Sequence, residues 1–301
     1  MTVAPADPAA AAREQTAERL LRASAEHWYD PLTEIDWAEP LAPDLYYVPP
    51  HRSTLFGTEL WDRLSVPQRI ELTKHEVASI ASVGVWFETI LMHMLIRLYY
   101  DADPTSRHAQ YALTEIADEC RHSVMFGRMI EKLGCPVYGV DGIDRKLGRW
   151  LKTTATGVHM FAAILIAEEI LDTLQREAAT DDQVQPLIRT VSRIHVVEEA
   201  RHVRYARDEL IRQVQSAGRV RMAYSRLVLG RAAYSVATRL VHPNVYAAVG
   251  IDPHVGRRAA RANPYHQETL LWAARRVAAY LGGLGLIGGP GGALWRRAGL
   301  V

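Results

Sequence analysis

The stretch Asp118-Glu-Cys-Arg-His122 returns eighty residues later as Glu198-Glu-Ala-Arg-His202, and both copies contain Glu-x-x-His. In an α-helix, residues three positions apart lie on one face, so each copy can present a carboxylate and an imidazole to the same partner. A single Glu-x-x-His is common on a solvated helix surface. The repetition makes the two copies a candidate metal-ligand pattern.

A further glutamate precedes each copy at the same interval. Glu88 stands 31 residues before Glu119, and Glu168 stands 31 residues before Glu199. At about 1.5 Å of rise per helical residue, Glu88 and Glu119 lie at similar distances from the connection between their helices, and therefore nearly level across a hairpin. Two glutamates and two Glu-x-x-His pairs converging from four helices are typical of di-iron or di-manganese sites in ferritin-like bundles.

The spacing of apolar residues supports four long helices around these positions, because long windows rich in Ala, Leu, Glu, Arg and Met leave little room for strands. Short connections make the first and second helices, and then the third and fourth, antiparallel neighbours. The sequence therefore predicts an all-α fold with a ferritin-like four-helix bundle core and additional N- and C-terminal helices. The four helices are expected at residues 67–100, 103–134, 146–179 and 183–217.

Composition limits the classes of function. Among 301 residues, 35 Lys and Arg face 34 Asp and Glu, so a net charge of +1 gives no long-range field to attract nucleic acid. Two cysteines exclude a disulfide framework and a four-Cys metal site. We expect one helical domain over residues 1–301, with a metal-binding core at 67–217 and C-terminal helices at 219–301.

Location and membrane association follow from the termini and the apolar stretches. The N-terminus has neither the basic region nor the apolar region of a signal peptide, which predicts a cytoplasmic protein. Helix formation is expected from Asp7-Pro8 onwards. Charged residues interrupt the apolar stretch 83–100, and glycines with Pro290 break the stretch 277–295, so no membrane span is predicted.

Glu88 and Glu168 are set in apolar sequence, where an unpaired carboxylate would be costly to bury. A metal pair is one solution, and a buried bridge to Arg or His is the alternative. His195 is a seventh candidate ligand, because it lies four residues before Glu199 on the same helical stripe. Its counterpart in the repeat is Glu115, which is expected to support a ligand or to lie exposed.

Other residues near the motifs have less specific signals. Asp118 and Glu198 can each orient an imidazole or pair with Arg121 or Arg201. Tyr205 can donate a hydrogen bond to the site or simply pack. Cys120 is expected to be a small buried hydrophobe and not a ligand.

Taken together, these residues resemble the p-aminobenzoate N-oxygenase (AurF) family of di-iron proteins, over about residues 67–213. The resemblance implies a bundle that holds two irons with four Glu and three His, and uses O2 to oxidise an arylamine nitrogen towards hydroxylamine and nitro products. Manganese or a mixed Mn/Fe pair is less favoured. The implied ligands are Glu88, Glu119, His122, Glu168, His195, Glu199 and His202.

The sequence says less about the substrate than about the metal site. Residues 77–87 contain no Lys or Arg, which argues against simply assuming an aminobenzoate carboxylate. Apolar residues near the ligands could line a substrate pocket or form ordinary core. These are Val85, Leu91, Met92, Phe126, Met129, Phe161, Ile164 and Leu165.

Two other functions fit the same ligands: hydroxylation or desaturation of carbon, and ferritin-like iron storage or detoxification. The additional C-terminal helices favour an enzyme with a covered pocket over storage. No flavin or nicotinamide fingerprint is present, so an external electron donor is expected. The partners predicted are a small amine and that donor, with a homodimer left open.

Overall fold

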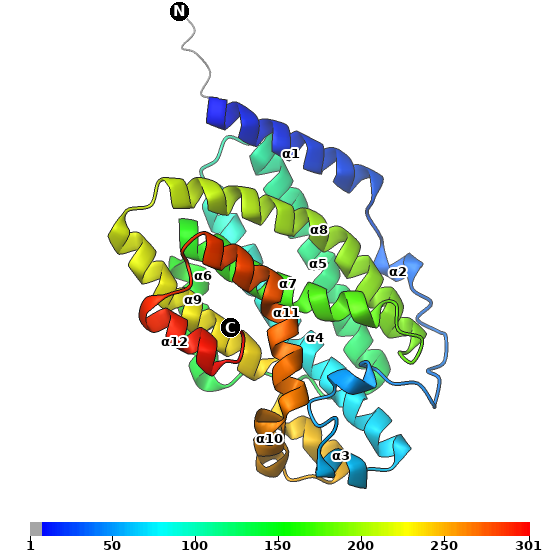
Figure 1. The fold of residues 1–301 in the computed structure, drawn as a ribbon. Helices are drawn as coiled ribbons and strands as arrows, with labels where there is room; N and C mark the ends of the chain where they lie inside the picture. The colour runs from blue at the N-terminus through cyan, green and yellow to red at the C-terminus, as the bar shows by residue number, and fades with distance from the viewer. Residues whose placement is uncertain (1–7) are drawn as a thin grey trace, which may run out of the picture.

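The computed structural model describes residues 8–301, and this part of the chain is α-helical, with a single isolated β-bridge between Tyr46 and Val184. The prediction of an all-α fold built on a four-helix core is confirmed (Figure 1). The core pairs α4 with α5 and α7 with α8. Their bounds are Val66–Tyr99 for α4, Arg107–Leu133 for α5, Gly157–Ala178 for α7 and Pro186–Gln215 for α8.

Local signals set the ends of the first two core helices. Ser65 caps α4, and its hydroxyl accepts from the backbone N–H of Gln68 while the Gln68 side chain returns to Ser65. Helix α5 begins later than predicted, because the Asp103 carboxylate accepts from the backbone and hydroxyl of Thr105 and holds a turn there. It ends at Gly134, whose φ of 63° suits the left-handed conformation of a helix cap.

The third predicted helix is wrong as one continuous element. The structure divides residues 146–179 between α6, Gly142–Thr154, and α7, with a break at Ala155 and Thr156. Gly157 has a φ of 57°, a conformation that side chains disfavour, so the chain changes direction there. Because of this break, α6 packs against α4 while α7 runs beside α8.

The terminal elements cover the core on different sides (Figure 1). Helix α1 lies against α5 and α8, while α9 and α11 pack on α7, and α12 packs on α9. The glycine-rich C-terminal segment contains α12. The remaining bounds are α1 Pro8–Glu26, α2 Pro31–Glu34, η1 Pro50–Arg52, α3 Glu59–Arg63, α9 Arg219–Arg239, η2 Pro243–Val249, α10 Pro253–Ala262, α11 Pro264–Gly283 and α12 Gly289–Arg297. The predicted start at Asp7 lies outside the described residues.

Two apolar clusters divide the bundle along its length. On α5, residues 109–112 belong to one cluster and residues 125–133 to the other. On α8, residues 205–210 and 188–194 divide in the same way. The segments between them carry the repeated motifs. The polar residues of the motifs are therefore enclosed between two hydrophobic halves, which exclude water from them.

Helix α4 is long and apolar enough, by length and composition alone, to cross a membrane. Within the fold, however, 56% of its most apolar window is buried against the other helices. A core helix of a bundle meets the same test, so this is weak evidence for a span.

Candidate metal centre

All seven predicted ligands meet in the middle of the bundle. Their donor atoms form overlapping groups in which the atoms lie within 4.8 Å of one another. Three of these groups involve only predicted ligands, and every member is buried. The three groups are Glu88 with His122 and His195, Glu119 with His122 and Glu199, and Glu168 with His195 and Glu199.

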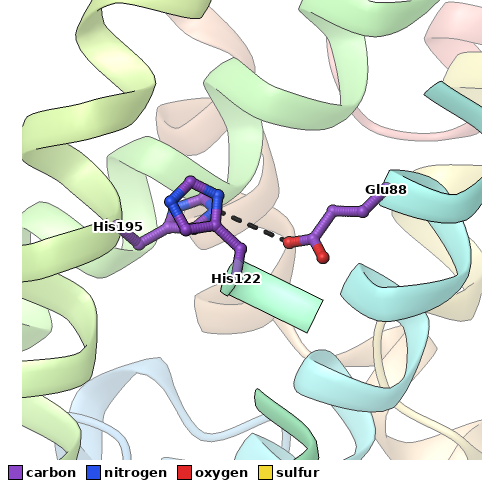
Figure 2. Close-up of side chains that lie close together, drawn as sticks. All are labelled: Glu88, His122 and His195. Atoms are coloured by element: carbon purple, nitrogen blue, oxygen red, sulfur yellow. Dashed lines mark ion pairs between the residues drawn. The ribbon is translucent and has the colours of Figure 1, made fainter. Parts of the chain in front are cut away.

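Glu88 enters the cluster from α4 and faces imidazoles from two other helices (Figure 2). Its Oε1 lies 3.7 Å from Nε2 of His195, and the rings of His195 and His122 have centroids 4.6 Å apart. Its Oε2 accepts a hydrogen bond of 2.6 Å from the Ser123 hydroxyl. One oxygen is thus fixed by the protein, and the other points to the imidazoles.

The two Glu-x-x-His pairs have the same local geometry. Nδ1 of His122 lies 3.1 Å from Oε2 of Glu119, and Nδ1 of His202 lies 3.1 Å from Oε2 of Glu199. Nδ1 of His202 is also 2.9 Å from Oε1 of Glu119. Both imidazoles therefore direct Nδ1 into the carboxylate cluster, as the i, i+3 spacing requires.

The opposite nitrogen of each imidazole contacts an acidic residue on the other motif helix. Nε2 of His122 lies 2.8 Å from Oε2 of Glu198, and Nε2 of His202 lies 3.1 Å from Oδ2 of Asp118. A carboxylate in this position fixes the orientation of the ring and increases its basicity. The arrangement is crossed, because α5 and α8 each supply the acid that supports the other helix's histidine.

The two supporting acids also pair with arginines, so both interpretations made from the sequence hold together. Arg121 pairs with Asp118 and lies 3.7 Å from Glu198. Arg201 lies 3.6 Å from Asp118 and 3.9 Å from Glu198. Each acid is buried and stands between an imidazole inside and a guanidinium outside, which compensates its negative charge.

Burial is the main influence on the pKa values of the carboxylates that no arginine in residues 8–301 contacts. It raises the pKa of Glu88 and raises that of Glu168 well above its usual range, where the nearby Glu199 and Glu119 add repulsion. Burial likewise raises the pKa of Glu115 well above the ordinary value. Crowded carboxylates in a dry site are costly as anions unless cations join them.

The histidines of the repeat shift in the opposite direction. Burial opposes their charge, but hydrogen bonds with Glu119 and Glu198 raise the pKa of His122 to about 10. Burial is likewise outweighed at His202, where Glu199 and Glu119 raise the pKa well above its usual value. The site therefore strongly favours positive charge next to its carboxylates.

These features fit a pair of divalent cations. Nδ1 of His195 and Oε1 of Glu199 are buried with no hydrogen-bond partner among the described residues. Over residues 8–301, no Lys or Arg lies within ion-pair distance of Glu88 or Glu168, so the bridge to Arg considered from the sequence is absent there. The bridge to His is present at Glu88, whose Oε1 lies 3.7 Å from Nε2 of His195. Glutamate oxygens and imidazole nitrogens without thiolate suit iron or manganese.

The predictions for three residues near the cluster had different outcomes. Glu115 is buried and forms a further potential ligand group with Glu119 and His202, so the expectation that it could lie exposed is wrong. Tyr205 packs on Tyr111 with ring centroids 4.9 Å apart, and its hydroxyl has no partner among the described residues. Cys120 is exposed, contrary to the prediction, because it lies on the outer face of α5.

Two cavities lie beside the cluster. The first, of about 260 Å³, is lined by Glu168 itself and by apolar residues of α4, α6, α7 and α9, including the predicted Leu91 and Ile164. The second, of about 90 Å³, is lined by the predicted Phe126 and Met129. Val85, Met92, Phe161 and Leu165 line neither cavity. The predicted pocket residues thus divide between two cavities and the core.

The sequence pattern did not indicate Ser123, whose hydroxyl donates a hydrogen bond to Glu88. It follows His122 directly, but the repeat has Val203 at the equivalent position, so the repeat gave no signal. Glu169 shows the opposite case. Although it adjoins Glu168, it faces away and forms a two-pronged ion pair with Arg207, which leaves Glu168 as the inward carboxylate.

Comparisons with known proteins identify relatives of this chain and a matching family. Two relatives are the uncharacterized protein Mb0909 of Mycobacterium bovis and the uncharacterized protein Rv0885 of Mycobacterium tuberculosis. Each is 27% identical over 235 residues, which cover 74% of this chain and 68% of the relative. The family model described as P-aminobenzoate N-oxygenase AurF matches residues 10–285, which include the whole cluster. By fold, residue pattern and this match, the chain belongs to the AurF family.

Proposed function

We propose that this protein is an O2-dependent, non-haem di-iron oxygenase of the cytoplasm that oxidises a primary amine, most favourably an aromatic one, at nitrogen towards hydroxylamine and nitro products. The observation that carries the proposal is the buried cluster of four glutamates and three histidines inside the region matched to the AurF family. An external reductant supplies the electrons, because the chain has no flavin, nicotinamide or Cys-rich motif of its own.

The seven residues would together hold the two metal ions. In this proposal the metal ligands are Glu88, Glu119, His122, Glu168, His195, Glu199 and His202. When bound, the iron pair supplies the redox chemistry that activates O2. Iron is favoured over manganese or a mixed pair because of the family.

The remaining groups of the chain orient the ligands and keep the site dry. Ser123 fixes one oxygen of Glu88, and Asp118 and Glu198 fix the two motif imidazoles. The apolar clusters on either side exclude water, which would otherwise compete with the substrate. Both adjoining cavities have mainly apolar linings, which suits an aromatic ring.

Metal analysis followed by a single turnover tests the proposal. The purified chain should bind two iron ions after reconstitution, as measured by elemental analysis. The reduced protein should then be exposed to O2 with aryl amines, alkyl amines or amine-free lipids, and the products identified by mass spectrometry. The control variant Glu131→Gln should bind iron and form product like the natural protein, because Glu131 is an exposed carboxylate on the same helix as Glu119.

Each result has a defined meaning. Hydroxylamine, nitroso or nitro products that depend on both iron and O2 support the proposal. Products oxidised only at carbon would replace it with hydroxylation or desaturation. Accumulation of iron mineral without an organic product would favour storage. Binding of one ion or fewer per chain would overturn the two-metal assignment.

A further inference from the structure

A third cavity, of about 440 Å³, lies where α9, α10, α11 and the C-terminal α12 meet. Four arginines line it, and no Asp or Glu does. They are Arg257 and Arg261 from α10, and Arg296 and Arg297 from the end of α12. The last two lie beyond the residues matched to the family model, which end at 285. Half of this arginine cluster therefore lies outside the matched region.

The arginine cluster contains no ion pair. Over residues 8–301, none of the four guanidinium groups lies within ion-pair distance of a carboxylate, unlike Arg121, Arg207 and Arg231, which each pair with a buried acid. Arg297 instead lies over the ring of Tyr234, 5.9 Å from its centroid. Burial and the charges of Arg261 and Arg239 lower the pKa of the half-buried Arg257. Like charges held together in this way favour an anion.

The arginine-lined cavity adjoins the 90 Å³ cavity beside the metal cluster. The two share five lining residues: Thr54, Leu240, Val241, His266 and Leu270. The inner cavity then continues to residues one helical turn from the predicted ligands, Gly84 before Glu88 and Ser192 before His195. At that end, the ring of Phe126 lies 5.2 Å from the ring of His195. The two cavities thus lie next to each other, and the inner one extends towards the metal cluster.

The inner cavity also contains polar groups that lack partners. Oε2 of Glu76, Oε1 of Gln175 and Nδ1 of His266 are buried without hydrogen bonds among the described residues. The one cation in its lining, Arg52, already forms an ion pair with Glu177. The inner cavity can therefore hydrogen-bond a bound molecule but offers it no free positive charge.

The cavity that contains Glu168 differs in this respect. Its single cation, Arg231, donates to Asp144 at 2.7 Å, and Asp144 is itself buried and also bound by Arg239. Positive charge there is already compensated. Of these three cavities, the arginine-lined one presents cations that have no ion pair within residues 8–301. Arg219 and Arg221 also lack ion pairs among the described residues, but they line a more open hollow beside Tyr224 that fewer residues enclose.

We infer that the arginine-lined cavity binds the anionic group of the substrate, a carboxylate or a phosphate, while the apolar body of that molecule passes through the inner cavity and places its amine at the metal centre. This inference rests on the proposed function, because it assigns the end of the substrate remote from the oxidised nitrogen. The absence of a cation in residues 77–87 is thereby explained, since the cations come from α10 and α12. The substrate is an elongated amine with a terminal anion.

Binding under anaerobic conditions tests the inference without requiring turnover. The iron-loaded full-length protein is titrated calorimetrically with 4-(4-aminophenyl)butanoate, with the primary amide of the same acid, and with the phosphate ester of 4-(4-aminophenyl)butanol. The same titrations are made with Arg257→Gln and Arg261→Gln. Arg275→Gln serves as the matched control, because Arg275 is exposed on α11 and lines none of the three cavities.

The anions should bind more tightly than the amide, and whichever anion binds more tightly identifies the preferred head group. Arg257→Gln should weaken binding of the anions by about tenfold, as expected for a charge-assisted hydrogen bond. The exposed Arg261 should contribute less, because water and salt screen it. Neither variant should change binding of the amide, and Arg275→Gln should change nothing.

Equal binding of acid and amide, or an equal loss of both in the arginine variants, would overturn the inference. So would variants that lose adhesion to anionic lipid vesicles while binding the small anions unchanged, because the arginines would then form a membrane surface. The experiments distinguish failure of this inference from failure of the proposed function. If binding depends on the arginines but no N-oxidised product forms, the N-oxygenase proposal is wrong. If neutral and anionic amines are both oxidised at nitrogen with equal KM, the anion site is wrong.

Discussion

Nε2 of His122 on α5 lies 2.8 Å from Oε2 of Glu198 on α8, so the acid of one motif supports the histidine of the other. The reciprocal contact joins His202 to Asp118 at 3.1 Å. Because the contacts cross between helices, each motif completes the environment of its repeat. The two helices therefore depend on each other for the geometry of the site.

The crossed contacts predict which substitutions are coupled. In the metal-free protein, Glu198→Gln and His122→Ala should have non-additive effects on the free energy of unfolding, with a coupling of about 0.5–3 kcal/mol. Glu198→Gln and His202→Ala should be coupled more weakly, because among the described residues only Arg121 and Arg201 link Glu198 to Asp118, the partner of His202. Urea unfolding of the single and double variants measures both cycles. Stronger coupling in the second cycle would mean that each acid serves the histidine of its own helix.

His195 should be essential for chemistry and dispensable for folding. Its Nδ1 has no partner among the described residues, and its Nε2 lies 3.7 Å from Glu88. His195→Ala should remain helical by circular dichroism but lose more activity than the roughly 10–100-fold expected for an outer support of a metal site. Glu199→Ala should reduce iron loading more broadly. His254→Ala, at an exposed position, is the control; unchanged turnover in His195→Ala would return His195 to a packing role.

Glu76 predicts a pH dependence of stability. Burial raises its pKa from 4.5 to about 7, although Thr54 donates to its Oε1 through both its backbone and its hydroxyl. The folded protein then holds a proton that the unfolded chain releases above 4.5. Stability from this group is therefore complete below pH 4.5 and falls as the pH rises to about 7, by roughly 3 kcal/mol.

Glu76→Gln should remove that part of the pH dependence. Urea unfolding at several pH values between 4.5 and 8 compares the variant with the natural protein. The buried His266, whose pKa is lowered to about 4 by burial, contributes to both proteins and cancels in the comparison. Curves that stay parallel across this range would show that Glu76 ionises normally.

Close packing of α12 on α9 predicts a large effect for a small substitution. A Cβ at Gly230 would overlap the backbone of Gly291, so Gly230→Ala must displace α12. We expect a loss of about 1–3 kcal/mol in the free energy of unfolding. Gly282→Ala, with no atom near the added methyl, should instead be stabilising by about 0.5–1 kcal/mol. Similar thermal midpoints for both variants would contradict this packing.

The sequence by itself determined the class of the fold and the residues of the cluster. Helical spacing places Glu119 and His122 on one face of their helix. The equal intervals from Glu88 to Glu119 and from Glu168 to Glu199 place the members of each pair at the same height in their hairpin. The interval of 31 residues to Glu199 fits Glu168 and not its neighbour Glu169, which the structure pairs with Arg207. Such information is local and repeats along the chain, so it can be read without coordinates.

Tertiary structure alone decided what surrounds the cluster. Nothing in the spacing assigns Glu198 to His122, because that contact depends on how α5 and α8 are rotated against each other. The prediction of one helix over residues 146–179 missed the break before Gly157, although the largely polar run 152–156 and the glycine interrupt the apolar pattern there. The arginines of α10 and α12 come together through packing between elements distant from the motifs. Contacts of this kind arise from the docking of whole helices, and no sequence interval records them.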